Sequence, residues 1–214
     1  MSCEIVLPVA LVTGAASGIG AATVRAIATR CRALAVHTRG ASPESRSRLA
    51  AMAALARDAG ADVLELDGDL AAPGTGRRLV EATLERFGSL DHLVANAGFA
   101  DRRGTADLTR ADLDRSFATM AGAFLELAQA ATPALKASPQ GRVVYLSSFV
   151  AHRYAQGALF PASAAAKAAG IPLLIYEFGY RKAALADLVY AAVFKDFAEV
   201  DALVGLHARE VAAA

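Results

Sequence analysis

Residues 13–20 read Thr-Gly-Ala-Ala-Ser-Gly-Ile-Gly, and this stretch decides the fold. An apolar run over residues 9–13 precedes it as a candidate buried strand, and a helical pattern over 21–30 follows it. Its glycines allow a tight turn and leave no side chain between the backbone and a bound pyrophosphate. The helix behind the turn supplies free N–H groups and the positive end of its dipole. A glycine-rich turn between a strand and a helix therefore predicts a nucleotide site.

Apolar runs and helix-like segments alternate through most of the chain. We expect strands over residues 9–13, 33–38, 62–67, 90–95 and 141–147. We expect helices over residues 21–30, 46–59, 75–87 and 111–136, and a polar loop over 39–47. Strands separated by helices pair in parallel through right-handed crossovers. The pattern predicts the α/β class, with a Rossmann-like, doubly wound parallel sheet.

The pattern changes after Lys167. Gly170-Ile-Pro172 is expected to interrupt a helix, because proline removes a backbone donor and clashes with the preceding turn. Residues 173–178 are apolar, and periodicity does not decide between strand and helix. Two amphipathic helices are expected over residues 182–197 and 198–211, within a single domain spanning 1–214.

Composition excludes several classes of function. With 22 Lys and Arg against 21 Asp and Glu, the net charge is +1, so neither nucleic acid nor an anionic membrane is an expected partner. Apolar residues are 55% and charged residues 20%, which argues against disorder, and no apolar stretch has the length of a membrane span. We expect no signal peptide. Cys3 and Cys31 lack metal-ligand spacing, so a reduced, cytoplasmic protein without a metal site is expected.

Four ordered motifs resemble the short-chain dehydrogenase/reductase family over residues 8–169, which leaves 170–214 as a divergent helical tail in which the family's C-terminal part is shortened or rebuilt. Residues 13–20 resemble the TGxxxGIG signature of the family. Asp69-Leu70 resembles the segment at the adenine ring, and residues 95–98 resemble the NNAG motif with Ala95 in place of the first asparagine. Ser147-Ser148 resembles the serine segment of the active site. The resemblance implies these cofactor-binding residues: Gly14, Ser17, Gly18, Ile19, Gly20, Asp69, Leu70, Asn96, Ala97, Gly98 and Lys167.

The end of the second expected strand selects between the two nicotinamide cofactors. An acidic residue there would bind the ribose 2′-hydroxyl of NAD. This chain has His37-Thr38-Arg39 instead, and Arg39 is suited to pair with a 2′-phosphate. The sequence therefore favours NADP(H), with NAD(H) as the alternative.

In this family a tyrosine exchanges the proton, a lysine four residues later lowers its pKa, a serine orients the substrate oxygen and an asparagine anchors a water. Ser148 and Lys167 match two of these positions, whereas Ser163 stands at the tyrosine position and Thr119 at the asparagine position. A serine hydroxyl is far less acidic than a phenol, whose pKa is about 10. The resemblance therefore implies that the usual proton donor is missing.

Other side chains are candidates to replace the missing donor. Tyr154 and His152 lie in the loop between Ser148 and Ser163, and Tyr154 is the favoured alternative. Tyr145 is expected in the core, the places of Tyr176 and Tyr180 are open, and His92 and His207 are expected to be structural. A Ser–Lys nucleophile built from Ser148 or Ser163 with Lys167 is disfavoured, because no oxyanion hole can be identified.

Three functional hypotheses follow. The preferred one is a subunit that binds NADP(H) without its own proton donor, in a homo- or hetero-oligomer with an intact homologue that interconverts ketones and alcohols. Small-molecule and carrier-bound carbonyl compounds are both open as substrates. The resemblance implies an interface through two apolar helix faces, residues 124–131 and 164–169, which are equally compatible with a core. The alternatives are an independent, atypical reductase and a nucleotide-binding regulator without redox activity.

Overall fold

The protein is described by a computed structural model over residues 6–148, 151 and 160–177, with the backbone alone for 171–177. These residues belong to one compact unit, Met1–Arg181. A second unit, Lys182–Ala214, lies outside the described residues, as do the two helices expected there. The single domain and the rebuilt tail stay predictions.

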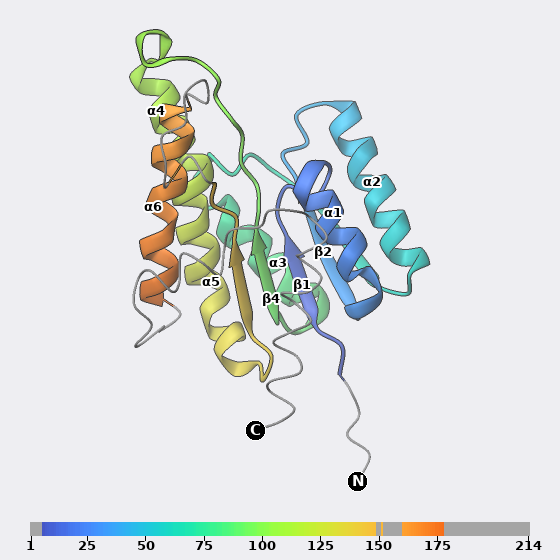
Figure 1. The fold of residues 1–214 in the computed structure, drawn as a ribbon. Coiled ribbons are helices and arrows are strands. Elements are labelled where there is room, and N and C mark those ends of the chain that lie inside the picture. Colours follow the sequence, from blue (N-terminus) through green and yellow to red (C-terminus); the bar gives the residue numbers. More distant parts are fainter. Residues whose placement is uncertain (1–5, 149–150, 152–159, 178–214) are drawn as a thin grey trace. The chain divides into compact units, whose positions relative to one another are not determined.

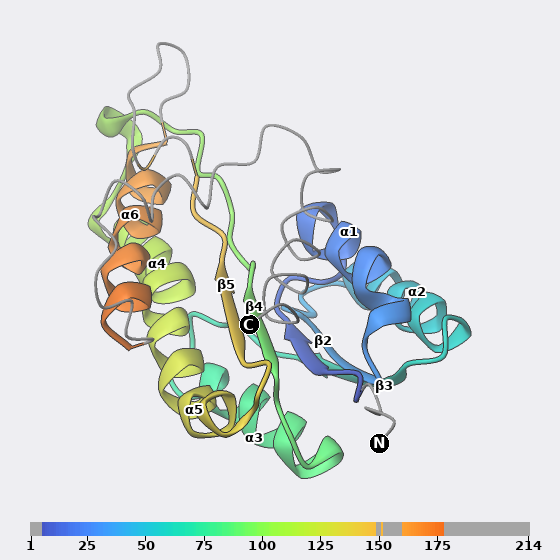
Figure 2. The ribbon, with the colours of Figure 1, turned by 60° about the horizontal axis from the view of Figure 1, so that its bottom comes forward.

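Within the described residues, five parallel strands form one sheet, whose order is β3-β2-β1-β4-β5 (Figure 2). Their bounds are β1 (Val9–Val12), β2 (Ala33–Thr38), β3 (Asp62–Asp67), β4 (His92–Ala95) and β5 (Arg142–Tyr145). Leu11 of β1 pairs with Ala35 on one side and with Leu93 on the other. This confirms the Rossmann-like fold. The strand order reverses between β1 and β4, where ligands bind beyond the carboxyl ends of the strands in such sheets.

Helices cover both faces of this sheet (Figure 1). On one face lie α1 (Gly18–Ile27), which continues into the 3₁₀ turn η1 (Ala28–Arg30), and α2 (Pro43–Asp58). On the other face lie α3 (Thr75–Phe87) and α5 (Ala123–Ala137). The short turn η2 (Thr105–Asp107) leads into α4 (Arg110–Phe117), and α6 (Pro161–Glu177) packs against α4 and α5.

Successive side chains of a strand point to opposite faces of the sheet, and they build one apolar cluster on each face. Ala10 and Val12 of β1 point into the cluster beneath α1 and α2, whereas Leu11 points into the cluster beneath α3 and α5. All four residues of β1 are fully buried. This is why the central strands appear in the sequence as unbroken apolar runs rather than as alternating ones.

The loop expected over residues 39–47 is shorter than predicted, because α2 begins at Pro43. Ser42 is the N-cap, and its hydroxyl accepts a hydrogen bond from the Ser45 N–H at 3.2 Å. Proline at the first helical position needs no backbone donor and has a helical φ already. The local capping pattern therefore starts the helix three residues before the apolar periodicity does.

The helix expected over 111–136 is present but has a π-helical insertion. Helix α4 passes into a π-helical segment, η3 (Ala118–Gly122), and then into α5. A π segment rotates the helix surface locally and is frequent at functional sites. Thr119 and Met120 lie in this segment, which places them beside the ends of β1 and β4.

The prediction that Gly170-Ile-Pro172 ends a helix is wrong. Helix α6 runs through Pro172 to Glu177, which also assigns residues 173–177 to a helix. A Cβ on Gly170 would lie 2.2 Å from Cζ of Tyr145, so glycine is required here to admit that ring. The contacts of α6 with α4, α5 and β5 offset the backbone hydrogen bond lost at the proline. Within the described residues, no helix is long and apolar enough to cross a membrane.

Candidate active site

The glycine-rich turn after β1 has little room for side chains. Gly14 and Gly18 have φ angles of 68° and 54°, a conformation that favours glycine. A Cβ on Gly20 would lie only 2.1 Å from the carbonyl oxygen of Gly14, so the first turn of α1 presses directly on the preceding loop. A Cβ on Gly18 would meet no atom within 4 Å, so the backbone at Gly18 borders open space.

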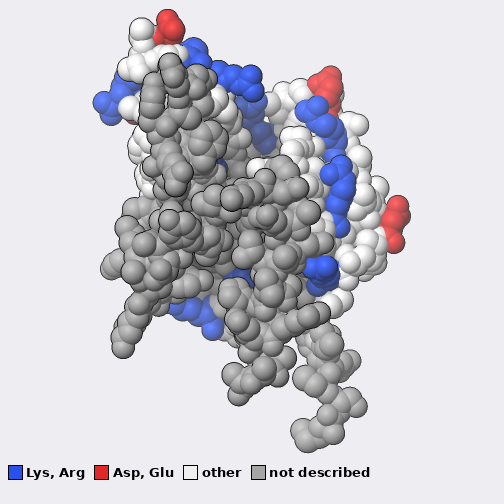
Figure 3. Space-filling model, in the orientation of Figure 1, with Lys and Arg blue, Asp and Glu red and all other residues white. Residues whose placement is uncertain are grey.

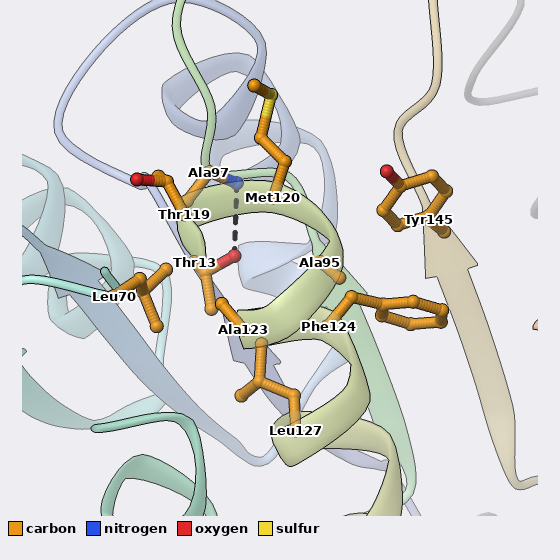
Figure 4. A pocket seen from close by; sticks show the side chains of 10 residues that line it. All are labelled: Thr13, Leu70, Ala95, Ala97, Thr119, Met120, Ala123, Phe124, Leu127 and Tyr145. Atoms are coloured by element: carbon orange, nitrogen blue, oxygen red, sulfur yellow. Dashed lines mark hydrogen bonds between the residues drawn. The ribbon is translucent and has the colours of Figure 1, made fainter. Parts of the chain in front are cut away.

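Thr13 and Asn96 hold this turn against the end of β4. The hydroxyl oxygen of Thr13 accepts hydrogen bonds from the N–H groups of Asn96 and Ala97, both at 3.1 Å. Figure 4 shows the bond from Ala97. In return, Asn96 Nδ2 donates to the Thr13 carbonyl oxygen at 2.8 Å. The structure thus brings the predicted residues of the two motifs together. Thr13 was not predicted as a site residue, although its place directly before Gly14 was a usable signal.

The N-terminus of α1 fits an anionic ligand. Ser17 is the N-cap residue, but its side chain makes no capping hydrogen bond, and the first turn carries no acidic residue. Ile19 beside it is 40% exposed. Free N–H groups and the positive end of the helix dipole thus meet the open space at Gly18. These residues fit the pyrophosphate of a dinucleotide.

The ends of β2 and β3 hold the residues predicted for the adenosine half. Leu70 is buried, and the Asp69 carboxylate accepts a hydrogen bond from the Ala71 N–H at 2.9 Å. Arg115 approaches the other Asp69 oxygen at 3.6 Å. Arg39 is exposed and makes no ion pair within the described part of the chain. It is therefore available to a bound anion.

His37 is a buried, neutral residue of this region that the sequence reasoning missed. Its Nε2–H donates to the Gly68 carbonyl oxygen at 3.0 Å, which leaves Nδ1 without a hydrogen-bond partner among the described residues. Burial lowers the pKa of His37. The imidazole thus supports the backbone of residues 68–70 by a hydrogen bond from its neutral form.

Basic side chains are numerous on the side of the molecule that carries α1 and α2. In Figure 3, which has the orientation of Figure 1, Lys and Arg side chains are visible along this side. The exposed arginines of α1 and α2 are Arg25, Arg46, Arg48 and Arg57, and Arg39 is exposed directly after β2. Arg46 forms an ion pair with Asp67 at 3.6 Å. This charge favours an anionic ligand near the end of β2.

Lys167 lies against the turn that follows β4. A Cβ on Gly98 would be 3.1 Å from Nζ of Lys167 and 3.3 Å from Sδ of Met120. Nζ donates to the Leu146 carbonyl oxygen at 2.5 Å and lies 5.4 Å from the ring centroid of Tyr145. Burial lowers the pKa of Lys167 to about 8. The structure therefore brings a partly desolvated amine to the predicted nicotinamide end.

The Ser163 hydroxyl is occupied by a neighbouring loop. It is 5% exposed, and its oxygen accepts a hydrogen bond from the Asp101 N–H at 2.9 Å. The Asp101 carboxylate pairs with Arg103 at 2.6 Å, and Arg103 also pairs with Asp112 at 2.7 Å. Arg103 lowers the pKa of both carboxyl groups. Ser163 thus anchors the loop between β4 and α4.

Tyr145 is a core residue, as predicted. Its ring lies 4.6 Å from that of Phe124, and its hydroxyl donates to the Lys167 carbonyl oxygen at 3.3 Å. Burial raises the pKa of the Tyr145 phenol. A phenol that is harder to ionise than in water is unsuited to exchange a proton at neutral pH.

Thr119 lines a small cavity together with Thr13, Met120 and Tyr145 (Figure 4). The cavity measures about 10 Å³, which suits one water molecule rather than a substrate. The hydroxyls of Thr119 and Ser147 are buried without a hydrogen-bond partner among the described residues. Ser148 is half-buried, and its carbonyl oxygen accepts a hydrogen bond from the Ala151 N–H at 3.0 Å.

Several predicted residues lie outside the described part of the chain. These are His152, Tyr154, Tyr180 and His207, and the Tyr176 side chain is not described either. His92 begins β4, where burial lowers its pKa. Phe124, Leu127 and Ala131 of the candidate interface are buried in the core of this chain. The described residues contain no cluster of three potential metal ligands.

Comparison of the sequence with known proteins identifies a family and several relatives. The short chain dehydrogenase family profile matches residues 8–175. An 11-beta-hydroxysteroid dehydrogenase 1A of Arabidopsis thaliana is 36% identical over 149 residues, which cover 67% of this chain and 40% of the relative. An L-rhamnose-1-dehydrogenase of Scheffersomyces stipitis is 31% identical, over 67% of this chain and 55% of that protein. The chain thus spans about half the length of these relatives or less.

Solved structures give the same result. A 3-oxoacyl (acyl-carrier-protein) reductase from Agrobacterium tumefaciens, with NADP bound, superposes with a TM-score of 0.70 at 33% identity, over 79% of this chain and 63% of that one. An L-sorbose reductase from Gluconobacter frateurii, complexed with NADPH and L-sorbose, has a TM-score of 0.69 at 27% identity, over 80% and 63%. With the glycine turn, the Asn96 link and the parallel sheet, these matches show that the chain belongs to the short-chain dehydrogenase family of oxidoreductases.

Proposed function

We propose that this chain is an NADP(H)-binding subunit of a ketone/alcohol oxidoreductase complex and lacks a proton donor of its own. The similar proteins include dehydrogenases and reductases that are named for steroids, sugars and acyl-carrier-bound substrates. They have in common the exchange of a carbonyl and a hydroxyl group. A small or carrier-bound carbonyl compound is therefore the proposed substrate class of the complex.

The chain's own residues bind and orient the cofactor. When bound, NADP(H) supplies or accepts the hydride. The N–H groups at the start of α1 bind the pyrophosphate, and Asn96 holds the glycine turn in shape for it. Arg39 binds the 2′-phosphate, since its guanidinium pairs well with phosphate oxygens. Asp69 and Leu70 are assigned to the adenine, and Gly98 and Lys167 to the nicotinamide ribose.

One observation supports the loss of the proton donor. The Asp101 N–H reaches the Ser163 oxygen at 2.9 Å, so the loop after β4 approaches α6 at the position where the family has a tyrosine. A buried serine used in this way neither has the acidity for proton exchange nor reaches beyond the loop. Lys167 still lies beside Gly98, at the proposed cofactor site. The chain thus keeps the lysine for cofactor binding but not the tyrosine for acid–base chemistry.

The rest of the proposal concerns assembly. A homologue that keeps the tyrosine supplies the missing proton donor in its own site, and this chain stabilises it in an oligomer. A cytoplasmic location belongs to the same proposal. It is based on the two cysteines, Cys3 and Cys31, whose spacing is not that of metal ligands, as is usual for thiols in a reducing compartment.

The proposal is tested by titrating the purified chain with NADPH and NADH and following nicotinamide fluorescence. We expect tighter binding of NADPH, a loss of that preference in Arg39→Asp, and an unchanged preference in Arg25→Asp as the charge control. NADPH consumption with a panel of ketones is then measured for the chain alone and after co-expression with a homologue that has the Tyr-x-x-x-Lys motif. Turnover by the chain alone would favour the independent reductase. Failure to bind either cofactor would overturn both readings.

A further inference from the structure

We propose that Tyr145 is a positioning residue, which holds the Lys167 ammonium in place for the cofactor. The inference rests on the proposed function, which assigns Lys167 to the nicotinamide ribose, and it adds a residue that acts through the lysine. Tyr145 ends β5, and α6, which carries Lys167, packs against that strand. The ring is 7% exposed. It is therefore buried close to the helix that carries the lysine.

The face of the Tyr145 ring is turned toward the Lys167 amine. Nζ lies over the ring, 5.4 Å from its centroid. A cation within about 6 Å of the centroid is attracted by the negative face of an aromatic ring, and more strongly where water is excluded. Nζ also donates a hydrogen bond to the Leu146 carbonyl oxygen at 2.5 Å. Both contacts favour the ammonium form and fix its place.

These two contacts are needed because the amine is partly buried. A buried charge costs free energy unless neighbouring groups replace the lost water. No carboxylate pairs with Lys167 in the described part of the chain, and Met120, whose Sδ lies at the same turn, is uncharged. The ring face and the Leu146 carbonyl oxygen thus supply the stabilisation that an ion pair would otherwise give.

The Tyr145 side chain also contacts the backbone of α6. Its hydroxyl donates a hydrogen bond to the Lys167 carbonyl oxygen at 3.3 Å. A Cβ on Gly170, three residues after the lysine, would lie 2.2 Å from Cζ of the ring, so the ring packs directly against the helix backbone. One side chain thus contacts both the backbone and the amine of Lys167.

The amine is held in this way beside the turn that follows β4. Tyr145 pairs with Ala95 of β4, and Gly98 comes three residues after Ala95. A Cβ on Gly98 would lie 3.1 Å from Nζ, so the amine lies against this turn. A lysine side chain loses much conformational freedom when it is ordered. Holding it in advance therefore reduces the cost of ordering it when the cofactor binds.

Core packing is the alternative role for the Tyr145 ring. The ring lies 4.6 Å from that of Phe124, and both belong to the apolar cluster beneath α3 and α5. That role needs only a side chain of similar volume, and it gives no reason for the affinity for NADPH to depend on an aromatic face. The two roles are therefore separable by experiment.

A double-mutant cycle on the dissociation constant of NADPH, measured by nicotinamide fluorescence on the full chain, tests the proposal. Tyr145→Leu removes the ring face, and we expect it to weaken binding about 3-fold or more, whereas Tyr145→Phe keeps the face and should keep most of the affinity. In a Lys167→Met background, Tyr145→Leu should weaken binding little further. An equal loss in both backgrounds would overturn the proposal.

A core variant controls for lost packing. Leu127→Val removes volume from the same apolar cluster, and Leu127 has no contact with the amine among the described residues. We expect it to lower the midpoint of urea unfolding and to leave the dissociation constant of NADPH unchanged. If it weakens NADPH binding as much as Tyr145→Leu does, core packing accounts for the effect and the proposal is wrong.

A measurement without cofactor separates this proposal from the proposed function. The chain has four lysines, so labelling their Cε carbons with ¹³C gives a simple NMR spectrum, in which Lys167→Arg identifies the Lys167 signal. The ring current of Tyr145 should shift the Lys167 Hε protons upfield in the unsubstituted chain and in Tyr145→Phe, but not in Tyr145→Leu. An unshifted signal would overturn the proposal whether or not NADPH binds. A shifted signal in a chain that binds no NADPH would instead overturn the proposed function.

Discussion

The glycine turn after β1 and the first turns of α6 both belong to the candidate site, but they are held together by different means. At the glycine turn, backbone groups and the side chains of Thr13 and Asn96 satisfy one another's hydrogen bonds. At α6, the Ser163 oxygen is taken by a loop, and the nearby hydroxyls of Thr119 and Ser147 have no partner among the described residues.

This difference separates two kinds of requirement. Holding a pyrophosphate depends on backbone shape, which many residues support jointly. Donating a proton depends on the acidity and reach of a single side chain, which one substitution removes. A chain of this family can therefore keep the architecture of cofactor binding while its acid–base chemistry changes. Each of the following predictions breaks or sharpens this comparison, from the largest expected effect to the smallest.

The glycine turn should tolerate substitution least. Gly20→Ala would place a Cβ 2.1 Å from the Gly14 carbonyl oxygen, so backbone must move. We expect the free energy of unfolding to fall by about 3 kcal/mol or more, with NADPH binding lost. Urea denaturation and fluorescence titration measure the two effects. Gly104→Ala, where a Cβ meets no atom within 4 Å, is the matched control and should change little.

The contact between α6 and β5 should come next. Gly170→Ala would place a Cβ 2.2 Å from Cζ of Tyr145, and we expect a loss of about 2 kcal/mol from overpacking. In a Tyr145→Leu background the clash is relieved, and alanine's helix propensity then favours Gly170→Ala. A double-mutant cycle by urea denaturation measures this coupling. An equal loss in both backgrounds would show that the ring is not the reason for the glycine.

The Ser163 anchor should have a smaller effect. Ser163→Ala removes the acceptor of the Asp101 N–H, and we expect the free energy of unfolding to fall by about 1 kcal/mol. Ser148→Ala serves as the comparison, since the Ser148 hydroxyl makes no hydrogen bond within the described residues, and it should cost less. Hydrogen exchange of the Asp101 amide should accelerate in Ser163→Ala alone. Unchanged exchange would remove the anchoring role.

Acid should weaken the adenosine end slightly. Burial lowers the pKa of His37 below its ordinary value of 6.5, so the folded state binds fewer protons than the unfolded state. The stabilisation is complete above about pH 6.5 and is lost progressively as the pH falls. Between pH 7.5 and 6, we expect His37 to lower the free energy of unfolding by less than about 0.8 kcal/mol.

This pH effect is measured by comparing denaturation curves of the chain and of His37→Gln, which keeps a donor for the Gly68 carbonyl oxygen. His92 is also shifted downward by burial, so His92→Gln isolates its separate share. If the free energy of unfolding of His37→Gln changes with pH as steeply as that of the unsubstituted chain, the assignment of this effect to His37 is contradicted.

The sequence by itself determined the order of strands and helices, because parallel α/β folds repeat buried apolar runs between amphipathic segments. It also determined the glycine turn, from its place between a strand and a helix, whereas Asn96 and Lys167 were identified by their resemblance to motifs of the family. Local signals were sufficient for these features. The capping of α2 by Ser42 was equally local, and was overlooked only because the polar residues around it resembled a loop.

Only the tertiary structure decided the course of α6 and the fate of Ser163. Gly170 and Pro172 are helix breakers by local propensity. The ring of Tyr145, from a distant strand, makes glycine necessary at position 170, and its hydroxyl binds the Lys167 carbonyl oxygen 22 residues later. Packing of α6 against its neighbours offsets the effect of the proline. Likewise, the Asp101 N–H that binds Ser163 comes from a loop 62 residues away. Such contacts depend on how elements pack, which the pattern of one segment does not contain.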